Sequence, residues 1–281
     1  MPLFLLLLDK IVPLPSVLLY CIFIFLGCGI LFFSLLITNR LRKNKETKER
    51  EEYATFIDLL FNAVISSNTS VHAILETGKY GKMFKNKKFR SMLVQDITHL
   101  HLNYTGESRL KLEEFYRKSG LINISFKKLK SQHWEKKCEG IRELTGLNIK
   151  EAFHDTYLCL QHPHDTLRLE ALLGLIRLDA VNCLSIIQNY PHNINDWIQL
   201  NLLYEIDKSD LTPLESFTSL LNSKNNSIVV LGIRLCAKFK QLENVPLIRE
   251  LQISTCSESI RSAAELALHK LSSTDDYILK A

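Results

Sequence analysis

The chain has 281 residues, which is enough for one or two domains with a substantial buried core. Glycine (10 residues) and proline (7 residues) are both scarce, and this composition disfavours an all-β or a disordered protein. The net charge of +5 is mild, and the basic excess is clustered in a few segments rather than spread along the chain.

Cysteine usage indicates a reducing compartment. The seven cysteines stand at positions 21, 28, 138, 159, 183, 236 and 256, without a CxxC pair. An odd, unpatterned set at mostly apolar helical positions is typical of reduced core thiols. A redox or metal role is the alternative.

Residues 1–38 are predicted to form a membrane anchor whose span covers about residues 17–37. This stretch of 21 residues carries no charge and is rich in Leu, Ile and Phe. As a helix it would be ~31 Å long, which matches the hydrocarbon thickness of a bilayer. Ahead of it, the apolar run 3–8 is followed by Asp9, Lys10, Pro13 and Pro15, which favour an interfacial or disordered segment. A cleaved signal peptide is the alternative, but the apolar core is long and no small-x-small cleavage site follows it.

A basic stalk, residues 39–52, follows the span. Only Lys10 stands on the other side, whereas six basic residues come directly after the span: Arg40, Arg42, Lys43, Lys45, Lys48 and Arg50. The positive-inside rule therefore predicts a single-pass protein of the cytoplasmic (inner) membrane, with its N-terminus outside and its C-terminal domain in the cytoplasm. We expect Arg40, Arg42, Lys43 and Lys45 either to contact anionic lipid headgroups or simply to form a solvated face.

Residues 53–130 are predicted to be a helical linker region. Apolar residues at helical spacing indicate helices over 53–65, 90–102 and 106–119, with a short one starting at 71–75. Between them, residues 79–90 carry six basic residues with interleaved aromatics, and they are interpreted as a loop. Lys85, Lys87 and Lys88 are candidates for membrane-surface contact, while a plain solvated surface and a nucleic-acid site are the alternatives. A basic linker with Lys127, Lys128 and Lys130 then leads into the next region.

Residues 131–273 contain an internal repeat, and residues 274–281 form a tail. Five segments share one apolar pattern, in steps of 33, 30, 31 and 32 residues. Their anchor positions are Trp134, Leu167, Trp197, Ile228 and Ile260. Four residues after each anchor stand Cys138, Ala171, Asn201, Gly232 and Ala264, which are small apart from Asn201. The clearest helices are expected at 165–178, 227–239 and 258–271, and shorter ones at 149–160, 180–188, 213–221 and 245–253. Two helices in each unit of this length predict a helix-turn-helix repeat.

With these residues placed, the pattern resembles HEAT repeats. The segments HDTLRLEALLGLIRLD (164–179) and SESIRSAAELALHKLS (257–272) are similar to the second helix of that family, with Leu167-Arg168 and Ile260-Arg261 at its start. Asn201 in the third unit and Val229 in the fourth depart from the pattern. The resemblance implies an all-α fold in which the N-terminal transmembrane helix is followed by an α-α superhelix, a HEAT-like solenoid.

The whole chain also resembles a group of bacterial single-pass membrane proteins with cytosolic HEAT repeats. GESRLKLEEFYRKSGL (106–121) and KKLKSQHWEKKCEGIREL (127–144) carry this second likeness. The setting is similar to that of membrane-bound glycosyltransferases which make surface polysaccharide. The resemblance implies such an enzyme system as the partner of this chain.

No catalytic constellation is present in the sequence. Phosphate loops, G-x-S-x-G and H-E-x-x-H are absent, so we expect neither an enzyme nor a bound cofactor or small-molecule substrate. The best metal candidates are His154, Asp155, His162, His164 and Asp165. His162 and His164 lie on either side of Pro163 in a predicted turn, so they would not share a helix face. The favoured interpretation is a polar turn in which Asp165 caps the next helix, with no metal bound.

A repeat protein of this kind presents a surface to partners. We therefore predict a membrane-anchored adaptor or scaffold that binds a membrane-associated protein. Both tryptophans occupy anchor positions, where core packing is the first interpretation and partner contact the second. The candidate partner-binding residues are Trp134, Arg168, Trp197, Arg234 and Arg261. The alternatives are a nucleic-acid-binding module that uses the basic segments, and an enzyme that uses the histidine cluster.

Overall fold

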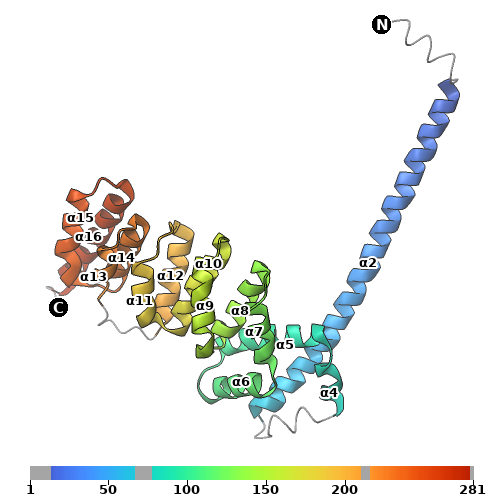
Figure 1. Ribbon diagram of the computed structural model, residues 1–281, viewed down its shortest axis with the longest axis horizontal. Coiled ribbons are helices and arrows are strands. Elements are labelled where there is room, and N and C mark those ends of the chain that lie inside the picture. Colours follow the sequence, from blue (N-terminus) through green and yellow to red (C-terminus); the bar gives the residue numbers. More distant parts are fainter. Residues whose placement is uncertain (1–13, 67–77, 210–215, 279–281) are drawn as a thin grey trace, which may run out of the picture. The chain divides into compact units, whose positions relative to one another are not determined.

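The computed structural model describes residues 14–66, 78–209 and 216–278, and within these ranges every regular element is helical. The chain divides into two units, residues 1–66 and 67–281, and each is described by itself (Figure 1). Two expected segments, the apolar run 3–8 and the short helix starting at 71–75, lie outside the described residues.

The first unit contains one long helix, α2 (Leu14–Ser66), which joins the predicted anchor, the basic stalk and the apolar segment 53–65 without a break. From Leu18 to Ile37 all large apolar side chains are exposed, so this part is hydrophobic all round. A helix of this kind is typical of a membrane span, and α2 is long and apolar enough to cross a membrane. From residue 38 to about residue 52 the helix is polar and mostly exposed, with an i,i+4 ion pair between Arg42 and Glu46 at 3.4 Å. Its last turns are apolar, and Ile57, Leu60 and Val64 are buried.

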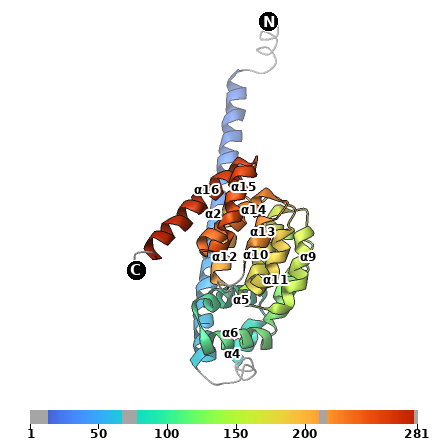
Figure 2. The ribbon, with the colours of Figure 1, turned by 90° about the vertical axis from the view of Figure 1, so that its left-hand side faces the viewer.

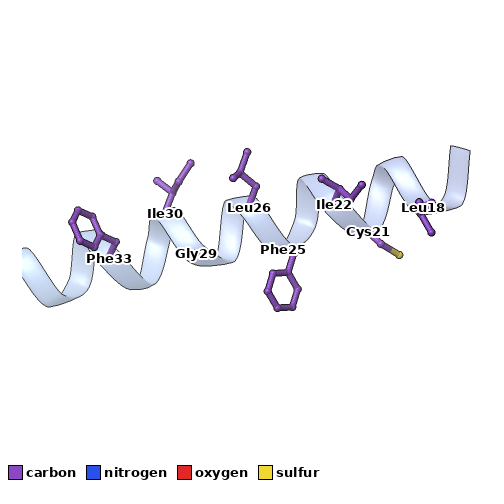
Figure 3. Close-up of a pocket in the computed structure, with 8 residues that line it drawn as sticks. All are labelled: Leu18, Cys21, Ile22, Phe25, Leu26, Gly29, Ile30 and Phe33. Atoms are coloured by element: carbon purple, nitrogen blue, oxygen red, sulfur yellow. The ribbon is translucent and has the colours of Figure 1, made fainter. Parts of the chain in front are cut away.

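A hollow lies along one face of the apolar part of α2. Figure 3 shows that the eight lining residues, from Leu18 to Phe33, all belong to this single helix. Gly29 lies among them, and nothing lies within 4 Å of the position that a Cβ would take there. The hollow is therefore the side of one helix, of a kind that lipid chains can fill.

The second unit begins with α4 (Gly78–Phe84), α5 (Lys87–Asn103), α6 (Gly106–Lys118) and α7 (Leu121–Leu129). Phe89, Leu93 and Phe115 are fully buried in this part. The interpretation of residues 79–90 as a loop was wrong. Apart from a short break they are helical, because the side chain of Asn86 accepts hydrogen bonds from the N–H groups of Lys88 and Phe89 and caps α5.

The predicted basic linker at residues 127–130 is also wrong. Residues 121–129 form helix α7, because Leu121, Ser125 and Leu129 fall on one buried face. Lys128 points into the protein and contacts Glu143, so it is not available to nucleic acid. Lys127 and Lys130 remain exposed.

The remaining helices cover residues 134–278, which include most of the region predicted to repeat. They are α8 (Trp134–Gly146), α9 (Phe153–Leu158) with flanking 3-10 turns, α10 (Asp165–Leu178), α11 (Ala180–Gln188), α12 (Asp196–Lys208), α13 (Thr218–Leu221), α14 (Asn226–Lys238), α15 (Val245–Ser254) and α16 (Glu258–Ile278). Helices α8, α10, α12, α14 and α16 pack each on the next, and Figures 1 and 2 show them following one another along the unit.

Glycines bring neighbouring helices of this unit close together. A Cβ at Gly140 of α8 would lie 2.5 Å from the backbone N of Leu129 in α7. A Cβ at Gly232 of α14 would lie 2.9 Å from Cβ of Leu220 in α13. Small residues at these crossings let the helix axes approach. Gly232 is one of the small repeat positions noted in the sequence, whereas Gly140 is not.

Candidate protein-binding surface

Among the described side chains of the second unit, the most exposed aromatics lie on helix α12, and its register explains why. The buried residues of α12 are Ile198, Gln199, Leu202 and Ile206. The prediction that Trp197 packs in the core is therefore wrong by one position, because Ile198 is the residue buried there. The indole of Trp197 is instead 72% exposed.

The exposed face of α12 carries three large apolar side chains. Trp197, Leu200 and Tyr204 are 72%, 58% and 53% exposed, and their spacing of three and four residues places them on one side of the helix. We call these three residues the α12 strip. Asn201 lies beside them and donates a hydrogen bond from Nδ2 to the carbonyl of Trp197 at 2.8 Å. Lys208 Nζ lies 4.4 Å from the centre of the Tyr204 ring.

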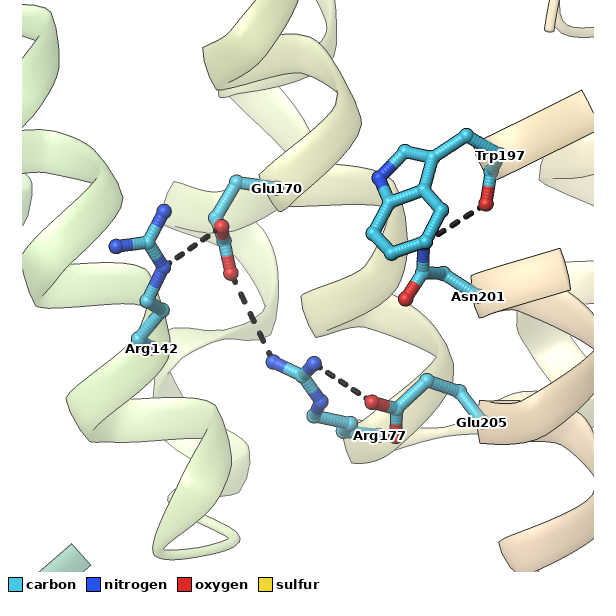
Figure 4. Close-up of polar contacts among 6 residues, drawn as sticks. All are labelled: Arg142, Glu170, Arg177, Trp197, Asn201 and Glu205. Carbon is cyan, nitrogen blue, oxygen red and sulfur yellow. Dashed lines mark hydrogen bonds and ion pairs between the residues drawn. The ribbon is translucent and has the colours of Figure 1, made fainter. Parts of the chain in front are cut away.

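A chain of ion pairs runs along the side of the strip that faces α10. Arg142 of α8 contacts Glu170 of α10 at 2.8 Å, and Glu170 contacts Arg177 at 3.7 Å (Figure 4). Arg177 then reaches Glu205 of α12 at 2.6 Å. These ion pairs therefore link three successive helices, and their two positive and two negative charges balance.

The side of α12 that faces α14 is closed in a similar way. Arg234 of α14 contacts Asp196 at 2.8 Å, and Lys238 contacts Asp207 at 2.9 Å. Arg234 also donates a hydrogen bond to Gln199 Oε1 at 2.9 Å. Since these charges are satisfied within the protein, the strip is an apolar surface between two rims of neutralised charge.

Buried polar groups hold α12 in this orientation. The amide of Gln199 is 3% exposed and donates hydrogen bonds to the carbonyls of Ile194 and Ser227. Asn195 caps the helix by accepting a hydrogen bond from the N–H of Ile198 at 3.0 Å. Rotation of α12 about its axis would leave the buried amide unsatisfied, so the exposure of the α12 strip is built into the core.

The five residues predicted to bind a partner lie on five different helices and do not form one site. Trp134 is half-buried and stacks on the ring of His164, with ring centroids 3.7 Å apart. Arg168 is only 12% exposed and donates hydrogen bonds to the carbonyls of His162 and Pro163. Arg234 forms the contacts with Asp196 and Gln199 described above. Arg261 donates a hydrogen bond to the carbonyl of Thr255 at 3.1 Å. Of the five, Trp197 alone belongs to the α12 strip.

The predicted membrane-surface residues lie in two places. Arg40, Arg42, Lys43 and Lys45 are exposed on α2. Lys85, Lys87 and Lys88 are exposed where α4 meets α5 in the second unit. Both groups are accessible to solvent, and each lies on a unit of its own.

The polar turn before α10 has a different structure from the predicted one. Asp165 does not cap the helix, because it lies in the first turn behind His164 and pairs with Arg168. His162 Nδ1 accepts a hydrogen bond from the N–H of His164 at 3.1 Å. Across the ranges described, no group of three or more His, Cys, Asp or Glu residues is placed to hold a metal ion.

The buried thiols are poor nucleophiles. Burial raises the pKa of Cys138 to about 11 and the pKa values of Cys183 and Cys236 to about 12. The thiolate is the reactive form of cysteine, so these residues are chemically quiet near neutral pH.

Two members of the strip, Leu200 and Tyr204, were not among the predicted site residues. The signal was Asn201: a polar residue at an expected core position indicates that the register has moved by one. Searches with the sequence find no matching family model and no matching characterised protein.

Proposed function

We propose that this protein is a membrane-anchored helical-repeat adaptor with a HEAT-like solenoid, which binds the apolar face of an amphipathic helix in a membrane-associated protein. The α12 strip is the observation that carries this proposal. Exposed Trp and Tyr side chains provide the largest contributions at protein interfaces, and a helix face with this spacing fits another helix laid across it.

The rims of the strip support the choice of partner. The ion pairs on both sides of α12 are satisfied within the protein, so the surface does not demand counter-charges from a ligand. A nucleic acid would need such charges, whereas the apolar face of an amphipathic helix would not. The sequential packing of α8, α10, α12, α14 and α16 supports the solenoid, and the apolar part of α2 supports the anchor.

Membrane attachment would strengthen such binding. If α2 spans the membrane with the second unit in the cytoplasm, adaptor and partner are confined to one plane and their effective concentration rises. The positive charges after the span favour that orientation. A glycosyltransferase system of surface polysaccharide synthesis remains the predicted source of the partner.

The test is a double substitution, Trp197→Ala with Tyr204→Ala, in the full-length protein. Native membranes are first chemically cross-linked and then solubilised in mild detergent. The proteins recovered with the full-length protein are identified by mass spectrometry. Loss of one such contact residue costs ~2 kcal/mol or more, and hot-spot losses do not simply add, so the affinity for the partner is expected to fall at least ~30-fold. A matched control is Ile253→Ala on α15, which removes an 84% exposed apolar side chain outside the strip.

The proposal requires that the control retains the partner while the double variant loses it. Equal recovery by both variants would place the binding surface elsewhere. Cross-links from the strip to a second copy of this chain alone would show that the strip is a self-association surface, which also contradicts the proposal.

A further inference from the structure

A second feature of the unit lies far from the α12 strip along the chain. A cavity of about 270 Å³ opens between α4, α5 and the turn that joins α6 to α7. Its lining residues are Phe84, Arg90, Ser119, Gly120, Leu121 and Ile124. No carboxylate is among them.

Aromatic packing sets the position of this cavity. The ring of Phe84 lies edge-on to Phe89 at 5.8 Å and to Phe115 at 6.3 Å, between ring centroids. These contacts fasten the end of α4 to α5 and α6. Phe84 and Phe89, two aromatics of the basic segment 79–90, therefore contribute to the core of this part.

Arg90 is the principal polar group of the cavity. Its Nε is buried and has no hydrogen-bond partner, and within the described ranges its guanidinium forms no ion pair. A buried donor without a partner costs on the order of 1–3 kcal/mol, and more when the group is charged. An unpaired guanidinium at the wall of a cavity is the arrangement expected where an external anion completes the hydrogen bonding.

The turn between α6 and α7, which also lines the cavity, provides further donors. Gly120 has φ +76° and stands at the N-cap of α7, where it has no side chain to cap the helix. The N–H groups of Leu121 and Ile122 have no acceptor among the residues described. The first turn of a helix carries a partial positive charge, and its free N–H groups bind anions. Ser119 Oγ lies on the same wall and can rotate away from the carbonyl of Tyr116, 3.3 Å from it.

Charge around the cavity also favours an anion. Lys85, in the break between α4 and α5, and Lys87, the first residue of α5, are exposed a few residues before Arg90 along the chain. By contrast, Arg117 and Lys118 beside the turn are already paired with Glu151 and Glu114. Among the described lining residues Arg90 is thus the one cation, and it has no counter-charge within the described ranges.

We infer that this cavity binds a phosphate group, with Arg90 as the charged donor and the N-terminus of α7 as the second donor. The volume is small for a drug-sized ligand and suits a single phosphate with the start of its ester group. A lipid headgroup and a soluble phosphate ester offer the same chemistry. The inference does not depend on partner binding at the α12 strip.

The experiment uses the full-length protein in phosphatidylcholine nanodiscs and inorganic phosphate as the probe. Binding is measured by titration calorimetry and by the rise in melting temperature. Arg90→Met is expected to weaken phosphate binding ~10-fold or more, because a charge-assisted hydrogen bond contributes at least that factor to affinity. Lys136→Met, an exposed lysine on α8, is the control and is expected to leave binding unchanged.

A second variant guards against a folding defect. Ser119→Asp places a carboxylate in the cavity beside Arg90, so it supplies the missing counter-charge from within. We expect this variant to melt at the same temperature as the wild type or higher, and to lose phosphate binding. If phosphate does not bind the wild type, or binds Arg90→Met and Ser119→Asp as well as the wild type, the inference is wrong.

Nanodiscs that contain phosphatidic acid distinguish the two sources of phosphate. A headgroup in the cavity competes with the probe, so the apparent affinity for inorganic phosphate falls in these discs and Arg90→Met abolishes the difference. An unchanged affinity identifies a soluble phosphate ester as the ligand class. Both results require an intact phosphate site at Arg90.

Discussion

At the scale of single residues, the clearest constraint is a buried charge between α7 and α8. Glu143 is 5% exposed, and its carboxylate accepts hydrogen bonds from Ser125 at 2.6 Å and from Lys128 at 2.5 Å. Lys128 is only 14% exposed and also lies 3.4 Å from Glu139. A pair of this kind contributes little relative to apolar packing, but the loss of one partner leaves an uncompensated buried charge.

Replacement of Lys128 alone should therefore be costly. Lys128→Met is expected to lower the free energy of unfolding by ~3 kcal/mol, because Glu143 then stays buried without its cation. The combination Lys128→Met with Glu143→Gln removes both charges, keeps an acceptor for Ser125, and should recover more than half of that loss. Thermal and urea unfolding of the full-length protein in detergent measure both values. A cost below ~1 kcal/mol for the single variant would mean that the pair behaves as a surface contact.

At the scale of helices, α7 and α8 approach each other more closely than any side chain allows. A Cβ on Gly140 would lie 2.5 Å from the backbone N of Leu129 and 2.8 Å from the carbonyl oxygen of Ser125. Both neighbours are backbone atoms of α7, which cannot turn aside as a flexible side chain does. The crossing therefore depends on the absence of a side chain at residue 140.

Gly140→Ala should destabilise the protein although alanine favours helices. Overpacking at a closed contact costs ~1–3 kcal/mol, whereas the gain in helix propensity is at most ~1 kcal/mol. We expect a lower melting temperature, measured by circular dichroism. Lys136→Ala on the same helix faces solvent and serves as the control, with an expected change within ~0.5 kcal/mol. A Gly140→Ala variant as stable as the wild type would show that the helices can separate freely.

The bounds and registers of the helices show how much of the fold could be predicted from the sequence. Helices 165–178 and 180–188 have the predicted bounds, because each has one apolar face and clear boundaries. In α12, two large apolar residues, Trp197 and Ile198, stand side by side, so the pattern fits two registers. The polar Asn201 argues against the register with Trp197 in the core, and the packing of Leu202 and Ile206 places Ile198 there. The Arg90 cavity could not be predicted, since it joins segments about thirty residues apart.

At the scale of the whole molecule, orientation in the membrane decides what the second unit can meet. The basic residues Arg40, Arg42, Lys43 and Lys45 follow the apolar part of α2 and favour retention of their side in the cytoplasm. Cys256 is a natural reporter of that side, because its thiol is exposed. Cys138, Cys183 and Cys236 do not compete, because burial raises their pKa values to about 11 to 12.

Labelling of Cys256 with a membrane-impermeant maleimide tests the predicted topology. At pH 8 a thiol of pKa about 11 is only roughly one part in a thousand thiolate, and burial blocks access to it as well. Cys21 and Cys28 are changed to serine, so that the label reports on the second unit. We expect Cys256 to react in sealed inverted vesicles, and in right-side-out vesicles only after detergent is added.

Neutralising the positive charges that follow the span should weaken the preference for the orientation with the second unit in the cytoplasm. Replacing Arg40, Arg42, Lys43 and Lys45 with glutamine leaves few positive charges beside the apolar segment, so a mixed orientation is expected. Cys256 would then react partly in intact right-side-out vesicles. Full labelling of the wild-type protein in those vesicles would place the second unit outside the cell. In that case the α12 strip would meet extracytoplasmic partners, and the proposed cytoplasmic adaptor would be wrong.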